Sequence, residues 1–393
     1  MITNSQSQAK FTITVDEVIN GKIKIEPALP SDNKVVAGNN LKITAMPDKG
    51  FVLDSVYYFG RGGCDTMYFE SMKSPFEIAI DQDKRIGASF IEISEVNHIN
   101  VTNNVVYAQP GVKPLKYDVF SPIKAKNLPI IIIIHGGGWA TNCEDVMRGM
   151  ARELTKNGKY VVFSIDYRWA GKLDGDSKGN TMADIISDVF GSIAHIMEHA
   201  QTYGGDPNNI AVTGDSAGGH LSAVVVNMTD KIGDGGFGEV ADVFEFMPSY
   251  IPKGKTVVDV RTEMMKAIKA VAPSYGVFNA NRLNNYSENK EADHSWKEAI
   301  APLSNIPKAS DRYIPQYLTR GTNDFLIKDE DVKEYADALV KAGQRVEYIQ
   351  IGGANHAFFD WKPDSQTKST FKKYGIYYCK QMELFFDSVF YVE

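Results

Sequence analysis

Residues 210–220 read Ile210-Ala-Val-Thr-Gly-Asp-Ser-Ala-Gly-Gly-His220 and carry the strongest structural signal in the chain. They contain a Gly-x-Ser-x-Gly pentapeptide, Gly214 to Gly218, between an apolar run and a helix-like segment, His220 to Met228. In a sharp strand-to-helix turn the serine oxygen is exposed, and the flanking glycines relieve crowding against neighbouring backbone. The pentapeptide alone arises often by chance, but this context is the one that the turn requires. We therefore expect Ser216 to be a nucleophile.

Around this turn, apolar strand candidates alternate with helix candidates, which predicts a mainly parallel sheet with helical crossovers. Several strands are apolar throughout and are expected to be buried on both faces. The expected strands are Lys116–Phe120, Ile130–Ile134, Val161–Ile165, Ile210–Thr213, Ala267–Ala272, Gln316–Arg320 and Val346–Ile351. The expected helices include Met182–Tyr203 and Glu330–Ala342, the latter ending at Gly343.

A glycine-rich loop, His135-Gly-Gly-Gly-Trp139, follows the apolar strand Ile130–Ile134. Consecutive glycines let backbone N–H groups approach an oxyanion, and the residue after the nucleophile supplies another donor. We expect Gly137, Gly138 and Ala217 to form such an oxyanion hole. A flexible glycine turn is the alternative interpretation. Within the loop, His135 is expected to be a structural anchor and Trp139 to contact substrate.

The acid and the base are expected in the order that follows a Ser nucleophile in this type of sheet, first the acid and then the histidine. Asp324 in Gly321-Thr-Asn-Asp324 follows one expected strand, and His356 in Gly352-Gly-Ala-Asn-His356 follows the next. The competing carboxylates, Asp329, Glu330 and Asp331, begin a helix, where acidic residues stabilise the positive end of the helix dipole. Asp324 and His356 are therefore the expected acid and base.

Two further histidines, His195 and His199, lie four residues apart on an expected helix that also carries Asp184 and Asp188. Such spacing could hold a metal ion, but no third ligand has convincing spacing, and a solvated helix face is the favoured interpretation. We expect no metal and no organic cofactor.

The first part of the chain, from Phe11 to about Ile93, consists of short alternating runs separated by Gly, Pro, Asn and Asp, which predicts a small antiparallel β module. The runs are Phe11–Val15, Lys22–Ile25, Leu41–Ala45, Phe51–Val56, Phe76–Ile80 and Ile86–Phe90. Its pattern of Gly21-Lys-Ile-Lys-Ile, Leu41-Lys-Ile-Thr-Ala-Met-Pro-Asp-Lys-Gly-Phe51 and Ala88-Ser-Phe90 resembles the divergent internalin-type repeat domain. We expect residues 1–95 to form this accessory domain and residues 96–393 to form the second domain.

Several motifs together resemble the hormone-sensitive-lipase-like α/β-hydrolases. They are His135-Gly-Gly-Gly-Trp139, Asp166-Tyr-Arg168, Tyr203 to His220, Gly321-Thr-Asn-Asp324 and Asn355-His356. The resemblance runs from about Asn100 to the C-terminus and implies an α/β-hydrolase fold with a Ser-His-Asp triad. The His-Gly-Gly-Gly-Trp form is similar to that of bacterial carbohydrate esterases that remove acetyl or feruloyl groups from plant polysaccharides, so the resemblance implies this ester hydrolysis.

One stretch departs from that pattern. Residues 230–265 insert a glycine-rich and then aromatic segment with Phe237, Phe244, Phe246 and Tyr250. Loops on the catalytic face carry specificity in this architecture, so the segment could be a lid over the acyl pocket. A surface insertion without a role in catalysis is the alternative.

Composition excludes other classes of protein. The formal net charge is -7, with acids and bases interleaved, so nucleic acid is an unexpected partner. The longest apolar run, Pro129 to Ile134, is far too short to cross a bilayer. The three cysteines are widely spaced, which indicates neither a disulfide framework nor a Cys-x-x-Cys pair. They are Cys64, Cys143 and Cys379. The first residues, Met1 to Gln8, have neither the basic start nor the apolar stretch of a signal peptide. The resemblances nevertheless imply a secreted or cell-surface protein, and a cytoplasmic one is the alternative.

Competing functions stay open at this point. Within enzymes, the alternatives to a polysaccharide esterase are a general short-chain carboxylesterase and a peptidase of the same fold. A different class is a surface-binding protein with a vestigial hydrolase domain. The expected partner of the second domain is a small-molecule or polysaccharide-linked ester, and the β module is expected to bind carbohydrate or a cell surface.

Overall fold

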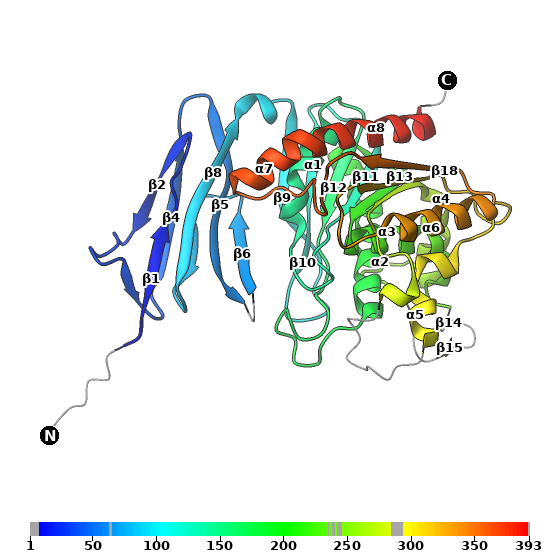
Figure 1. Ribbon diagram of the computed structural model, residues 1–393, viewed down its shortest axis with the longest axis horizontal. Helices are drawn as coiled ribbons and strands as arrows, with labels where there is room; N and C mark the ends of the chain where they lie inside the picture. Colours follow the sequence, from blue (N-terminus) through cyan, green and yellow to red (C-terminus); the bar gives the residue numbers. More distant parts are fainter. Residues whose placement is uncertain are drawn as a thin grey trace. The chain divides into compact units, whose positions relative to one another are not determined.

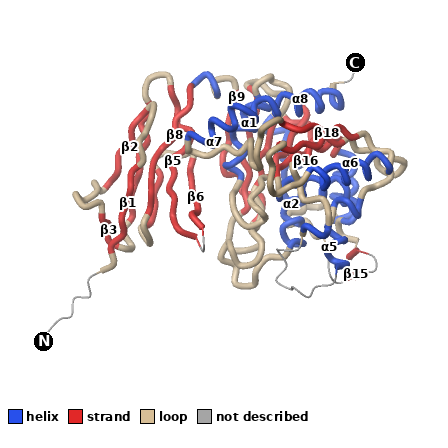
Figure 2. The backbone as a smooth tube through the Cα atoms, viewed as in Figure 1, coloured by secondary structure: helices blue, strands red, loops and turns tan. Residues whose placement is uncertain are grey.

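The computed structural model describes residues 8–62, 65–234, 236–237, 240–241, 246–283 and 294–391. The chain divides into two compact units, Met1–His98 and Ile99–Glu393. The first unit is built almost wholly from strands, whereas the second mixes strands and helices (Figure 2). Cys64 lies outside the described residues. Among the described residues, no helix combines the length and the apolar character needed to cross a bilayer.

The first unit consists of two β-sheets with a shared apolar core. One sheet has the strand order β3-β1-β8-β5-β6 and the other β2-β4-β7. Their bounds are β1 Lys10–Val15, β2 Gly21–Glu26, β3 Lys34–Val36, β4 Asn40–Pro47, β5 Phe51–Gly62, β6 Asp65–Ser71, β7 Phe76–Ala79 and β8 Lys84–Glu92. Side chains from both sheets, among them Ile13, Ile43, Val56 and Ile78, form one cluster. This unit therefore buries a core of its own.

The expectation of a purely antiparallel module is wrong at one pair of strands. β1 pairs in parallel with β8, from Ile13 opposite Lys84 to Val15 opposite Ile86, while it pairs antiparallel with β3. Between β1 and β8 the chain crosses to the second sheet and back three times, at β2, β4 and β7. A long connection of this kind permits a parallel pairing that a short hairpin does not.

Within the described residues, the second unit is built on an eight-stranded sheet with the order β18-β17-β16-β13-β11-β12-β10-β9. The strands are β9 Ile99–Ala108, β10 Leu115–Pro122, β11 Leu128–Ile134, β12 Val161–Ile165, β13 Gly205–Asp215, β16 Ile268–Ser274, β17 Gln316–Gly321 and β18 Val346–Ile351. The six strands from β18 to β12 are parallel, and β10 is antiparallel to both of its neighbours. The carboxyl ends of the six parallel strands therefore meet at one edge.

Helices cover both faces of this sheet (Figure 1). Their bounds are α1 Arg148–Thr155, α2 Met182–His199, α3 Ala217–Met228, α4 Val257–Ala267, α5 His294–Ile300, α6 Asp329–Lys341, α7 Ser365–Thr370 and α8 Ile376–Phe390, with a π-helical turn at Phe371–Gly375. α1 packs against α8 on one face, whereas α2 packs against α3 and α4 on the other. A core cluster with Ile132, Ile193 and Val224 fills the space beneath α2 and α3.

The segment 230–265, expected as a lid, is described only in part, because residues 235, 238–239 and 242–245 lie outside the described residues. So do Phe244 and the side chain of Phe237. The described end of the segment is α4, whose Val260 and Met264 are buried in the core, so this portion is a crossover helix that leads into β16. Ahead of it, the N–H of Ser249 donates to the carbonyl of Ser187 in α2. A lid therefore stays a prediction.

Candidate active site

Ser216 lies at the turn between β13 and α3, and its backbone has φ 52° and ψ −113°. Few residues with a side chain adopt a positive φ, so this turn holds the serine in a strained conformation. Its N–H donates to the carbonyl of Ser274, the last residue of β16, at 3.0 Å. The side chain is thereby presented at the carboxyl edge of the sheet, at the first turn of α3.

His356 joins Ser216 to Asp324. Its Nε2 lies 2.9 Å from Ser216 Oγ, and its Nδ1 lies 2.8 Å from Asp324 Oδ2. An ionised carboxylate can only accept, so Nδ1 carries the proton and Nε2 accepts from the serine hydroxyl. The structure thus brings together the three residues that the sequence predicts as nucleophile, base and acid.

The Asp324 carboxylate is fixed by its own loop. Its Oδ1 accepts the N–H groups of Leu326 and Ile327 at 2.9 Å each, and its carbonyl accepts from Arg320 at 3.1 Å. Burial opposes ionisation of this carboxyl, but the hydrogen bonds from His356, Ile327 and Leu326 outweigh it and lower the pKa. Asp324 is therefore held ionised and oriented towards His356.

The glycine loop after β11 lies against the Ser216 turn. A Cβ atom at Gly218 would overlap the carbonyl oxygen of Ile134, so only glycine permits this close approach. The expected donors Gly137 and Gly138 have φ values of 111° and 62°, and Ala217 is the first residue of α3. N–H groups at a helix start favour a negative charge.

His135 is buried and anchors this loop. Its ring stacks on Tyr167 with centroids 4.2 Å apart, and its Nδ1 donates to the carbonyl of Gly136 at 2.7 Å. Asp166 Oδ1 lies 3.4 Å from Nε2 and accepts from Lys113 at 2.9 Å. All of these contacts hold the loop in place.

The expected substrate contact at Trp139 is not supported by where the ring lies. Trp139 is 3% exposed, belongs to the apolar core and meets the buried ring of His220 edge to face at 5.3 Å. The backbone of Trp139 has a positive φ of 59°. A substrate contact at Trp139 therefore stays a prediction.

The competing carboxylates occupy other places. Asp329 accepts from Lys333, Tyr348 and Gln350 at the start of α6, and Asp331 pairs with Arg282 at 2.9 Å. Both therefore stabilise the surface around the first turn of this helix.

His195 and His199 stack on each other with centroids 4.1 Å apart. His195 Nδ1 pairs with the hydroxyl of Tyr117 at 3.0 Å, and burial together with His199 lowers the pKa of His195 to about 4. Within the described ranges, no group of three His, Cys, Asp or Glu side chains is arranged to hold a metal ion.

Two residues near the triad were missed in the sequence. Asp215 accepts the N–H of Gly136, and Tyr275 packs its ring against His356 with centroids 4.7 Å apart. Asp215 lies inside the Gly-x-Ser-x-Gly pentapeptide, directly before Ser216, and this position is the signal that could have identified it. Tyr275 stands in no motif, and nothing in the surrounding residues marks it.

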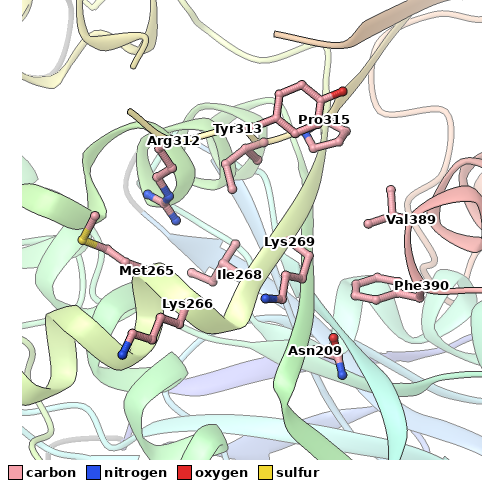
Figure 3. Close-up of a pocket in the computed structure, with 11 residues that line it drawn as sticks. Asn209, Met265, Lys266, Ile268, Lys269, Arg312, Tyr313, Pro315, Val389 and Phe390 are labelled. Carbon is pink, nitrogen blue, oxygen red and sulfur yellow. The ribbon is translucent and has the colours of Figure 1, made fainter. Parts of the chain in front are cut away.

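A pocket of about 570 Å³ lies at the opposite, amino edge of the sheet (Figure 3). It lies beside the starts of β13, β16 and β17, and its basic residues are Lys266, Lys269 and Arg312. Arg312 and Met265 flank one side of the view, and Val389 and Phe390 the other. Because Ser216 follows the far end of β13, this pocket is separate from the triad.

Comparison with known proteins identifies related chains. The BD-FAE family model matches residues 117–344. A carboxylesterase, NlhH of Mycobacterium tuberculosis, is 35% identical over 112 residues, which are 28% of this chain and 33% of NlhH. The probable carboxylic ester hydrolase LipM of the same organism is 27% identical over 245 residues, 58% of this chain and 49% of LipM. The chain thus spans about half or less of the length of these relatives.

Solved structures show the same fold. Esterase 2 of Thermogutta terrifontis superposes with a TM-score of 0.54 at 22% identity, covering 75% of this chain and 96% of that one. A truncated carbohydrate esterase from gut microbiota superposes with a TM-score of 0.55 at 22% identity, covering 74% and 95%. The expected α/β-hydrolase fold is confirmed.

Proposed function

The chain belongs to the BD-FAE family, and we propose on that premise that it is a serine carboxylic ester hydrolase that removes feruloyl or acetyl groups from plant cell-wall polysaccharide. One observation carries the hydrolase part of the proposal: the hydrogen-bonded chain from Ser216 Oγ through His356 to Asp324, with distances of 2.9 and 2.8 Å. This arrangement is that of a nucleophile, its general base and the acid that orients the base.

In the proposed first half-reaction, Ser216 Oγ attacks the ester carbonyl carbon while His356 Nε2 takes the hydroxyl proton. The tetrahedral intermediate collapses as the imidazolium returns this proton to the departing alcohol, which leaves an acyl-enzyme on Ser216. Water then attacks the acyl carbon with His356 again as base, and the carboxylic acid is released. Asp324 keeps Nδ1 protonated and stabilises the imidazolium.

The oxyanion formed in each half-reaction is assigned to the N–H groups of Gly137, Gly138 and Ala217. Each such donor contributes about 3 kcal/mol of transition-state stabilisation where water is excluded. The helix start at Ala217 supports this assignment, because its N–H groups carry the positive end of the helix dipole. No step requires a metal or a cofactor.

The acyl group and the polymer are the finer part of the proposal. They are supported by the likeness to a carbohydrate esterase from gut microbiota and by family membership. We further propose that the β module attaches the enzyme to carbohydrate or to a cell surface, and that the protein acts outside the cell.

The experiment is a substrate panel of acetylated xylan, feruloylated arabinoxylan, p-nitrophenyl acetate and a peptide amide, each tested with the intact protein and with Ser216→Ala. We expect hydrolysis of the two polymers and of the aryl ester, and a loss of about four orders of magnitude or more in Ser216→Ala. A protein that turns over only the aryl ester would be a general carboxylesterase. Failure on every ester, with no labelling of Ser216 by a fluorophosphonate, would refute the esterase itself.

A further inference from the structure

Tyr275 combines three unusual features next to the triad. It is completely buried, its φ is 33°, and its hydroxyl has no hydrogen-bond partner among the described residues. A bulky residue at positive φ is strained, and a buried hydroxyl without a partner is destabilising. Strain of this kind concentrates at functional sites, so an outlier next to a triad points to a role there.

The contacts of Tyr275 show what the strained backbone achieves. Its ring lies 4.7 Å from the His356 ring, centroid to centroid, and is tilted by 59°. On its other sides it meets Phe358 at 5.4 Å and Phe359 at 5.3 Å, so the ring is wedged between the imidazole and two further aromatic rings. A side chain packed in this way has little freedom to move away from His356.

The end of β16 links the parts of the triad. The carbonyl of Ser274 accepts the N–H of Ser216 at 3.0 Å, and the next residue, Tyr275, supports the base. The N–H of Tyr275 in turn donates to the carbonyl of Thr319 at 2.7 Å, in the strand that precedes the Asp324 loop. One short segment of backbone thus fixes the spacing of nucleophile and base.

We propose that Tyr275 is a positioning residue for the base, and that its aromatic ring holds the His356 imidazole in the orientation in which Nε2 faces Ser216. This inference rests on the proposed function. His356 follows β18 on a loop with two positive φ values, 78° at Gly353 and 56° at Ala357, and its side chain remains 12% exposed. The buried wall formed by Tyr275 therefore limits rotation of the ring away from the serine.

The ring and not the hydroxyl is assigned this role, because the ring makes the contact with His356. Two variants separate the two parts of the side chain. Tyr275→Leu keeps an apolar side chain and loses the aromatic plane, whereas Tyr275→Phe loses only the oxygen. Phe163→Leu is the matched control, because Phe163 is equally buried in β12 and packs against Tyr117 at 5.5 Å and Tyr203 at 5.9 Å.

The experiment measures kcat and KM for p-nitrophenyl acetate, the rate of fluorophosphonate labelling at Ser216, and Tm for each variant of the full chain. We expect Tyr275→Leu to lower kcat and the labelling rate by about 10- to 100-fold with KM within about 3-fold, as for a misplaced catalytic group. Tyr275→Phe should keep kcat and the labelling rate close to those of the parent, with Tm at or above the parental value. Phe163→Leu should lower Tm without a comparable loss of kcat. Should Tyr275→Leu not fold, Tyr275→Met takes its place.

Three results would overturn the inference. Parental kcat in folded Tyr275→Leu would remove the role altogether. If Tyr275→Phe lowered kcat as much as Tyr275→Leu, the hydroxyl and not the ring would position His356. If Phe163→Leu lowered kcat equally, the effect of Tyr275→Leu would reflect general core packing. A parent protein that neither hydrolyses esters nor reacts with the probe would instead refute the proposed function, so the two failures are distinguishable.

Discussion

Asp215 and Gly136 are joined by a hydrogen bond in which the N–H of Gly136 donates to Asp215 Oδ1 at 2.5 Å. Asp215 immediately precedes Ser216, and Gly136 stands in the glycine loop after β11. The bond therefore ties the nucleophile turn to the loop that carries Gly137 and Gly138. Burial, followed by the negative charge of Asp360, raises the pKa of Asp215 well above its ordinary value.

We expect Asp215→Ala to lower kcat by about 10-fold or more, because the loop loses its fixed acceptor, and to destabilise the fold by roughly 1–3 kcal/mol. Asp215→Asn keeps an oxygen acceptor and matches a protonated carboxyl in charge, so it should retain most of the activity. Kinetics on an aryl ester and thermal melts check both variants. Equal loss in the two would show that the charge of Asp215 matters more than its hydrogen bond.

Asp324→Asn should lower kcat by about 10⁴-fold, because the amide favours the wrong tautomer of His356 and gives no charge support to the imidazolium. Asp329→Asn is the matched control, since Asp329 is a nearby carboxylate with partners in α6 and β18. Its activity should stay close to that of the parent. If the ranking of the two variants were reversed, Asp329 would be the catalytic acid.

The pKa of Asp118, in β10, makes the free energy of unfolding depend on pH. Burial, followed by the charge of Glu144, raises its pKa to about 8, and its Oδ2 has no partner among the described residues. The folded state therefore keeps a proton that the unfolded chain releases near pH ~3.9. Between these two values the folded state binds more protons, so stability falls as pH rises.

Asp118→Asn removes this ionisation and keeps an acceptor for the N–H of Asn104, which Asp118 Oδ1 now binds at 2.7 Å. Between pH 5 and pH 8 its Tm should fall less than that of the parent, by a difference of about 3 °C or more. Asp311→Asn, at an exposed carboxylate, serves as the control. Parallel Tm curves for Asp118→Asn and the parent would contradict the predicted proton uptake.

Deletion of residues 1–94 should leave hydrolysis of a small soluble ester near the rate of the intact protein. Each unit encloses its own apolar cluster, one containing Ile43 and Val56, the other Ile132 and Val224. Hydrolysis of insoluble polysaccharide should fall more steeply, because tethering raises the effective concentration only at a bound surface. Both substrates are to be compared on a monodisperse sample with a single melting transition. Equal loss on both would mean that the β module shapes the active site.

Sequence patterns predicted the elements whose signals are local. β12 and β18 begin and end at the predicted residues, because a mostly apolar run marks β12 and apolar residues interrupted by Glu347 and Gln350 mark β18. β9 was missed, since this edge strand carries Thr102-Asn-Asn104 and leaves much of its surface exposed. This composition predicts a turn, and the strand is recognised only once its pairing with β10 is known.

Ser216, Asp324 and His356 were predictable because each follows a strand within a recognisable motif. Tyr275 and the bond from Gly136 to Asp215 were not, because both depend on which strand ends are neighbours in space. The order β16-β13-β11 brings Tyr275 and Gly136 to either side of Ser216, and this order cannot be read from spacing along the chain.

The positive φ of Ser216 bears on whether the second unit is a working hydrolase or only a binding surface. A strained residue of this kind costs about 1–3 kcal/mol, and glycine at position 216 would relieve that strain at once. If this unit served only as a binding surface, substitution of Ser216 by glycine would stabilise the fold without any loss of function. A serine in so unfavourable a conformation therefore argues that its side chain is used as a nucleophile.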